Sequence, residues 1–144
     1  VKCALEAGVV AGGGATLAYL AGQKDKIMAD MDFVDEDEMR GAEIVFRAIT
    51  APVQQIAANA GVDGAVVLET VKDSEYGYGY NAATNVYENL IDAGVLDPAK
   101  VTCWGVENSA SISGSILTTN CLICEIPVKD DPAAAGMADS MMGY

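Results

Sequence analysis

The residues whose types and spacing could support chemistry begin with three consecutive glycines, Gly12 to Gly14. Glycine lets a backbone come close to a phosphate, a base or a sugar, because no Cβ stands in the way. A Walker loop would need Gly-Lys-Ser/Thr, and the next lysine is only Lys24. A dinucleotide fingerprint would need glycine where Leu17 stands, although an acidic residue follows at Asp30. Two interpretations stay open, which are a turn against a nucleoside and tight helix packing.

Two further positions could contact a small ligand. The segment 80–84 carries small residues that a ligand could approach, and the Asn81 amide can make paired hydrogen bonds. Asp97 precedes Pro98, which predicts a helix N-cap followed by proline at the first helical position. A carboxylate in this place could instead accept hydrogen bonds from a ribose. For both positions the ordinary structural role stays open beside the ligand-binding one.

Other candidate chemistry is excluded or has a structural explanation. The chain has no histidine, so it contains neither a Ser-His-Asp nor a Cys-His catalytic set. The acidic stretch 30–38 lacks the glycine and glutamate of EF-hand spacing, and we interpret it as a surface insertion. On a strand Cys121 and Cys124 would face opposite sides, with no second pair at zinc spacing, which favours structural cysteines. No metal site is predicted, and Trp104 is expected in the core or an interface.

Composition places these residues in one globular unit. A chain of 144 residues supports one core, so it is one domain or a piece of a larger one. With 51% hydrophobic and 20% charged residues we expect a soluble folded protein. A net charge of −13 argues against binding nucleic acid or an anionic membrane. Four unevenly spaced cysteines favour a reducing compartment. The start at Val1, inside a helical pattern, suggests a fragment.

Periodicity and turn signals predict the elements that position the candidate residues. The last predicted strand has no evident partner in the chain, which suggests an edge covered by a missing segment or a neighbouring subunit. In chain order we predict helices over 1–10 and 15–21, a helix over 38–60 bent or split at Pro52, a helix over 65–72, a hairpin over 76–87, a short helix over 88–93, a long helix from 98 to about 119, a strand over 121–128 and a disordered tail over 129–144.

Four ordered blocks resemble the C-terminal part of the group I chaperonin subunit, the GroEL-like family: EAGVVAGGGATL, RAITAPVQQIAANAGVDGAVV, YGYNAATNVYENLIDAGVLDPAKVT and ENSASISGSILTT. The likeness runs from residue 1 to about residue 128. It implies a mainly α fold, the C-terminal part of a multihelical equatorial domain with a short β-hairpin and a C-terminal edge strand. Residues 1–8 would end the intermediate domain and its hinge, 9–128 would be equatorial, and 129–144 would be the tail.

The resemblance also implies an ATP site. Gly13, the run Asn81-Ala82-Ala83 and Asp97 match the family's nucleotide contacts, with the glycine and the hairpin turn around the adenosine and the aspartate at the ribose hydroxyls. No catalytic residue is expected in this chain. The family's phosphate loop, its magnesium-binding aspartate and the aspartate that activates water all lie upstream, so ATP and Mg²⁺ are implied cofactors whose phosphate and metal contacts come from elsewhere.

The implied function is an ATP-hydrolysing chaperonin that encloses unfolded proteins and promotes their refolding. Its partners would be identical or related subunits in heptameric rings, a co-chaperonin and unfolded clients. The long acidic insertion and the tail AAAGMADSMMGY resemble organellar members, and the Gly-Tyr ending favours the plastid stroma over the mitochondrial matrix or the bacterial cytoplasm. A second hypothesis is a non-catalytic helical interaction module that keeps the ring-contact surface without ATPase activity.

Overall fold

The computed structural model describes residues 1–124, and within them the chain is mainly helical, as predicted. None of the helices in this range is long and apolar enough to cross a membrane. The elements are α1 (Lys2–Ala7), β1 (Val9–Ala11), α2 (Ala15–Gly22), α3 (Lys24–Ala29), α4 (Glu36–Ala48), α5 (Ala51–Asn59), α6 (Gly64–Lys72), β2 (Tyr78–Asn81), β3 (Val86–Asn89), β4 (Leu96–Pro98) and α7 (Ala99–Leu117).

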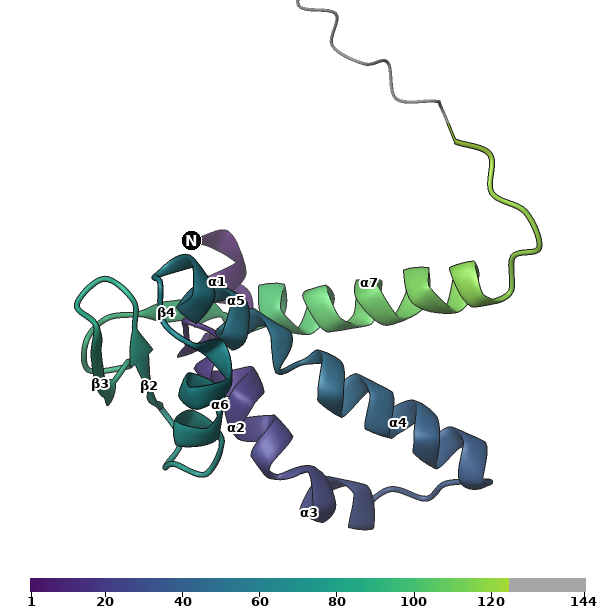
Figure 1. Ribbon diagram of the computed structural model, residues 1–144, viewed down its shortest axis with the longest axis horizontal. Coiled ribbons are helices and arrows are strands. Elements are labelled where there is room, and N and C mark those ends of the chain that lie inside the picture. Colours follow the sequence, from purple (N-terminus) through teal and green to yellow (C-terminus); the bar gives the residue numbers. More distant parts are fainter. Residues whose placement is uncertain (125–144) are drawn as a thin grey trace, which may run out of the picture.

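The core is small and lies where α2, α5 and α6 meet the β2–β3 hairpin. These three helices pack on one another, and α6 and α2 also contact β2. Figure 1 shows α4 and α7 running away from this core toward the same side, and neither of them contains a fully buried residue. The buried hydrophobic residues are Ala11, Ala15, Ala18, Val53, Ala57, Val67, Val71, Tyr80 and Leu90.

Local signals explain most helix boundaries. Pro52 lies in the first turn of α5, and the predicted helix over 38–60 is split just before it, at residues 49–50. The acidic stretch supplies the start of α4, because the Asp35 carboxylate accepts hydrogen bonds at 2.9 Å from the Asp37 and Glu38 N–H groups. Gly61 adopts a φ of 81° after α5, as expected of a glycine cap.

The predicted helix over 1–10 is wrong at its C-terminal end. It stops at Ala7, and Val9–Ala11 forms β1 instead. This strand pairs antiparallel with β4, and Val10 lies opposite Asp97. Valine favours extended backbone when a partner strand is present, and that partner comes from a segment almost ninety residues away in the sequence.

The predicted short helix over 88–93 is also wrong. Glu88 and Asn89 belong to β3, and a turn follows. The Asn89 side-chain oxygen accepts hydrogen bonds from the Ile91 N–H at 2.9 Å and the Asp92 N–H at 3.3 Å. Such a local side-chain bond competes with helix formation. The fully buried Leu90 further anchors the turn, since its N–H donates to the Gly77 carbonyl oxygen at 2.8 Å.

The predicted long helix is confirmed as α7, with two corrections nearby. Its N-cap is Pro98, because Asp97 lies in β4 and does not cap the helix. Of the two places predicted for Trp104, the core is wrong, because Trp104 is 49% exposed, with the Lys100 Nζ 4.5 Å from its ring centroid; an interface stays a prediction.

The C-terminal strand prediction can be compared with the structure only over its first residues. Cys121–Cys124 are not in a strand, and in the part of the chain described no other strand lies beside them to complete a ladder. The rest of the predicted strand, 125–128, and the predicted tail over 129–144 lie outside the described residues.

Candidate functional site

The three glycines form the turn between β1 and α2. Gly13 and Gly14 have φ values of 64° and 77°, a left-handed conformation that glycine adopts without steric cost. A methyl group on Gly14 would lie only 2.7 Å from the backbone nitrogen of Val53 in α5. Tight packing is therefore confirmed as one reason for the glycine at position 14. Gly12 and Gly13 are the glycines of this turn at which ligand contacts are considered next.

The glycine turn meets Asp97 on one side. The Gly12 N–H donates to the Val95 carbonyl oxygen at 2.9 Å, which extends the β1–β4 ladder by one bond. A methyl group on Gly12 would lie 3.1 Å from that oxygen and 3.3 Å from the Asp97 carboxyl carbon. The pairing of two short strands thus places the predicted carboxylate directly against the turn.

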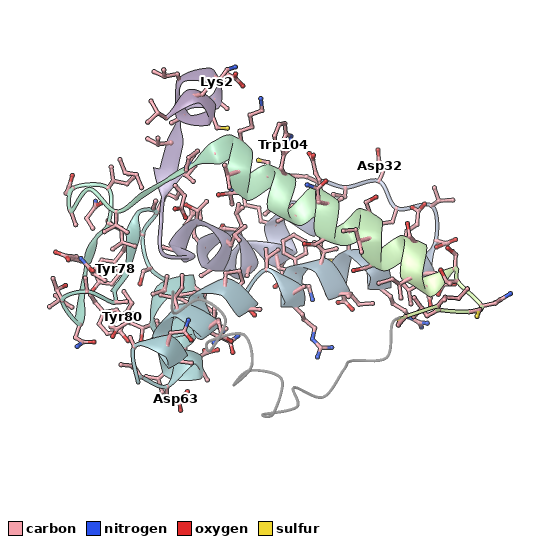
Figure 2. The ribbon with its side chains drawn as sticks, turned by 90° about the horizontal axis from the view of Figure 1, so that it is seen from above. Lys2, Asp32, Asp63, Tyr78, Tyr80 and Trp104 are labelled. Carbon is pink, nitrogen blue, oxygen red and sulfur yellow. The ribbon has the colours of Figure 1, made fainter. Side chains whose placement is uncertain are left out.

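The turn meets the hairpin on its other side. A methyl group on Gly13 would lie 3.6 Å from the Tyr80 carbonyl oxygen and 3.4 Å from the Leu90 side chain. Tyr80 immediately precedes Asn81, so the hairpin turn begins beside the glycine turn. Figure 2 shows Tyr78 and Tyr80 together on this hairpin. Two segments that lie about seventy and eighty residues downstream of Gly13 are therefore brought to it by the fold.

The Asn81 side chain is already used within the hairpin. Its Nδ2 donates to Glu88 Oε1 at 2.8 Å, and its Oδ1 accepts from the Ala83 N–H at 3.0 Å. The paired hydrogen bonds predicted for this amide are thus made to the protein. Ala82 packs against the core and Ala83 is exposed. Sequence reasoning missed Glu88, because only the register of the hairpin brings it to Asn81.

Unlike the Asn81 side chain, the Asp97 carboxylate is not engaged by other residues of the described chain. Its side chain is half-buried, and within residues 1–124 its carboxylate has no hydrogen-bond or ion-pair partner. In the glycine turn that Asp97 contacts through Gly12, the N–H groups of Gly13 and Gly14 find no acceptor among the same residues. A carboxylate beside uncommitted N–H groups offers both acceptors and donors, which suits a ligand with hydroxyl groups.

Asp97 also lines a groove of about 510 Å³ between the two projecting helices. It is the only charged residue of the lining, whose walls come mainly from α4, α5 and α7. The sequence did not predict this groove, because three separate helices form it. The apolar wall residues are Ala11, Leu17, Ile44, Val45, Ala48, Ile49, Pro52, Ile56, Val101, Val106 and Ala110.

Two ion pairs lie away from the groove. The Lys24 Nζ donates to Glu43 Oε1 at 2.9 Å and joins α3 to α4. This hydrogen bond, together with the Lys24 charge, lowers the pKa of Glu43 from its ordinary value of 4.5. On α6, the hydrogen bond to Glu69 raises the pKa of Lys72 from 10.5. Both pairs are structural and neither touches the glycine turn.

The remaining candidate ligands do not form a site in the described part of the chain. Cys121 and Cys124 are free and exposed. Residues 1–124 contain no group of three or more histidine, cysteine or acidic side chains placed to hold a metal ion. The uncommitted polar groups around the glycine turn remain the strongest candidate for ligand binding.

Comparison with known proteins shows which family this chain resembles in sequence and in fold. A family model described as "TCP-1/cpn60 chaperonin family" matches residues 1–127. A crystal structure of a group III chaperonin in the open state superposes with a TM-score of 0.70 at 27% identity, covering 84% of this chain and 25% of that chain. The open-state monomer of a group II chaperonin from Methanococcoides burtonii superposes with a TM-score of 0.67 at 17% identity, covering 77% of this chain and 28% of that chain.

These matches confirm the predicted fold class, a mainly helical chaperonin equatorial-domain fold with a few short strands. At 17% identity the second match bears on the fold alone. The chain spans about a quarter of the length of these solved structures.

Proposed function

Since this chain belongs to the TCP-1/cpn60 chaperonin family, we propose that it is the C-terminal part of the ATP-binding equatorial domain of a ring chaperonin subunit. The complete protein would enclose unfolded proteins and use ATP hydrolysis to drive their release and refolding. One observation carries the proposal for this segment: the glycine turn lies against both Asp97 and the start of the hairpin turn. These are the positions at which the resemblance implies nucleotide contacts.

The residues present suit the nucleoside part of ATP. The Asp97 carboxylate, half-buried and without a partner within residues 1–124, can accept hydrogen bonds from the ribose hydroxyls. Gly13 has no side chain to shield its backbone from a ligand, and its N–H is a free donor in the same range. Asn81 would act by shaping the turn, so that Ala82 and Ala83 present backbone, and the exposed Ala83 a small side chain, to the base.

The phosphate half of the site would come from outside this chain. Bound ATP supplies the free energy of hydrolysis, and the magnesium ligand, the phosphate loop and the group that activates water would lie on upstream residues. The groove is consistent with a site shared between this chain and upstream residues, because its apolar walls are exposed to solvent. Ile44 is 65% exposed and Val101 is 52% exposed. We propose that upstream parts of the same subunit cover these walls in the complete protein.

The finer identity rests on the sequence resemblance. The four blocks quoted above favour a group I chaperonin with heptameric rings of one or two subunit types and a co-chaperonin. The acidic stretch 30–38 and the Gly-Tyr ending favour the plastid stroma, with the mitochondrial matrix and the bacterial cytoplasm as alternatives. None of these features depends on the geometry of the glycine turn, so each can fail without affecting the nucleotide site.

ATP affinity of the full-length subunit tests the site. We expect Asp97→Ala to weaken ATP binding by about tenfold or more, since hydrogen bonds to a charged group each contribute about 1.5–3 kcal/mol. Asp92→Ala is the matched control, because Asp92 is an exposed carboxylate in the turn that precedes β4. Equal ATP affinity of the two variants and the wild type would show that Asp97 does not contact the ribose.

Ring assembly and ATP turnover test the wider function. Electron microscopy of the full-length protein should show closed rings, and the rings should hydrolyse ATP. Rings without turnover would instead support the non-catalytic interaction module. Absence of both rings and ATP binding would overturn the chaperonin proposal for this protein.

A further inference from the structure

Helix α1 packs on two later elements of the chain, β4 and α7. It contains no fully buried residue. Gly8 ends it with a φ of 78°, and the Ala99 N–H donates to the Gly8 carbonyl oxygen at 3.1 Å. Cys3 and Ala4 are its only half-buried residues, so these two positions lie on the side that faces its neighbours.

One ion pair shows which faces of α1 and α7 meet. The Lys100 Nζ on α7 contacts the Glu6 carboxylate on α1, and it also lies 4.5 Å from the Trp104 ring centroid. Figure 2 shows Trp104 rising from α7 on the side where α1, marked by Lys2, lies. The first turn of α7 therefore presents its Lys100 face to α1.

The two cysteines stand at matching sequence offsets from this ion pair. Both helices leave the antiparallel β1–β4 pair at the end where the Ala99 N–H donates to the Gly8 carbonyl oxygen, and the two helices contact each other. Residues three apart share a helix face. Cys3 is three residues before Glu6, and Cys103 is three residues after Lys100. Each cysteine thus lies on the same face as one member of the ion pair.

The geometry points to Cys3 and Cys103 as a redox-sensitive pair that can form a disulfide between α1 and α7. Both are free thiols in the structure, with Cys3 half-buried and Cys103 exposed. The oxidant is a small-molecule disulfide such as oxidised glutathione. The Cys103 thiolate attacks it and releases one thiol, and the Cys3 thiolate then displaces the second. Two cysteine thiols are oxidised, and one glutathione disulfide is reduced to two thiols.

The consequence is a covalent link between α1 and α7 in addition to the reversible Glu6–Lys100 ion pair. With the disulfide closed, α1 can no longer turn about Gly8 independently of α7. Cys121 and Cys124 lie beyond the end of α7 and are exposed, so they would react separately with the oxidant. Replacing both with serine leaves Cys3 and Cys103 as the only thiols of the chain.

Peptide mapping of the full chain in the Cys121→Ser/Cys124→Ser background tests the pair. After treatment with oxidised glutathione, we expect a non-reducing tryptic digest to contain a peptide with Cys3 joined to a peptide with Cys103, which reduction separates. Adding Cys3→Ser should stop the reaction at a glutathione adduct on Cys103. If the background protein instead accumulates that adduct while Cys3 stays a free thiol, the two residues are out of reach and the inference is wrong.

A denatured control separates proximity in the fold from chance encounter. In concentrated urea the two cysteines are linked only by a long flexible chain, so their effective concentration falls. The yield of the Cys3–Cys103 link relative to the glutathione adduct should be about tenfold higher in the native protein than in urea. Equal ratios in the two conditions would show that the fold does not bring the pair together.

Discussion

Gly12 and Asp97 lie so close together that a methyl group on Gly12 would stand 3.3 Å from the Asp97 carboxyl carbon. The contact is a direct result of strand pairing, because Val10 is opposite Asp97 and the Gly12 N–H continues the ladder to Val95. The position of the proposed ribose carboxylate is therefore set by a glycine more than eighty residues away.

This relationship predicts the effect of Gly12→Ala. The added methyl group must displace the Val95 carbonyl or the Asp97 side chain, and overpacking of this kind costs about 1–3 kcal/mol. We expect a weaker ATP affinity in the full-length subunit at temperatures where the variant is still folded. Isothermal titration on Gly12→Ala and on Gly41→Ala, whose methyl group would meet nothing within 4 Å, measures this. An unchanged affinity for Gly12→Ala would mean that Asp97 can move without loss of function.

Gly14→Ala should chiefly affect folding. The new Cβ would meet the Val53 backbone at 2.7 Å and would force alanine into a φ of 77°. Strain and overpacking together should lower the free energy of unfolding by about 2 kcal/mol or more. Gly41→Ala, in the exposed middle of α4, should raise it by about 0.5–1 kcal/mol, since alanine is the better helix former. Urea unfolding of the full chain would compare the two, and a loss for Gly14→Ala no larger than that of ordinary surface substitutions would contradict the packing described.

Leu90 anchors the hairpin to the glycine turn. It is fully buried, and its side chain lies against Gly13 and Gly79. Leu90→Ala should lower the free energy of unfolding by about 2–5 kcal/mol, the usual cost of removing a buried leucine side chain. Its neighbour Ile91 is 41% exposed, so Ile91→Ala should cost less, about 1 kcal/mol. Equal losses measured by urea unfolding would show that the hairpin does not depend on Leu90.

The Lys24–Glu43 ion pair predicts a dependence of stability on pH. The pKa of Glu43 is lowered in the fold by the Lys24 hydrogen bond and charge, so the pair stabilises the folded state above pH 4.5, the ordinary pKa. That contribution should disappear as the pH falls below 4.5 through the lowered folded value. The stability difference between the wild type and Lys24→Met should therefore be constant at neutral pH and shrink in acid. Lys26→Met removes a lysine that has no ion pair among residues 1–124. Its stability difference from the wild type should not shrink in this way as the pH falls below 4.5.

The sequence determined the parts of this protein that depend on neighbours along the chain. Pro52 divides α4 from α5, Gly61 follows the end of α5, and alternating tyrosines form β2, because each signal acts on backbone within a few residues. The four blocks that resemble the chaperonin family also belong to the sequence alone. They identified Gly13, Asn81 and Asp97 as candidates, although local reasoning left their roles open.

Only the tertiary structure decided where these candidates meet and what each one does. Val9 and Val10 form a strand because a partner from residues 96–98 pairs with them, and the same pairing makes Asp97 a strand residue beside Gly12 instead of a helix cap. The Asn81 amide is taken up by Glu88, a contact that depends on hairpin register. Strand pairing and helix packing join residues distant in sequence, so the pattern along the chain does not specify their contacts, and the physical site exists only once the chain is folded.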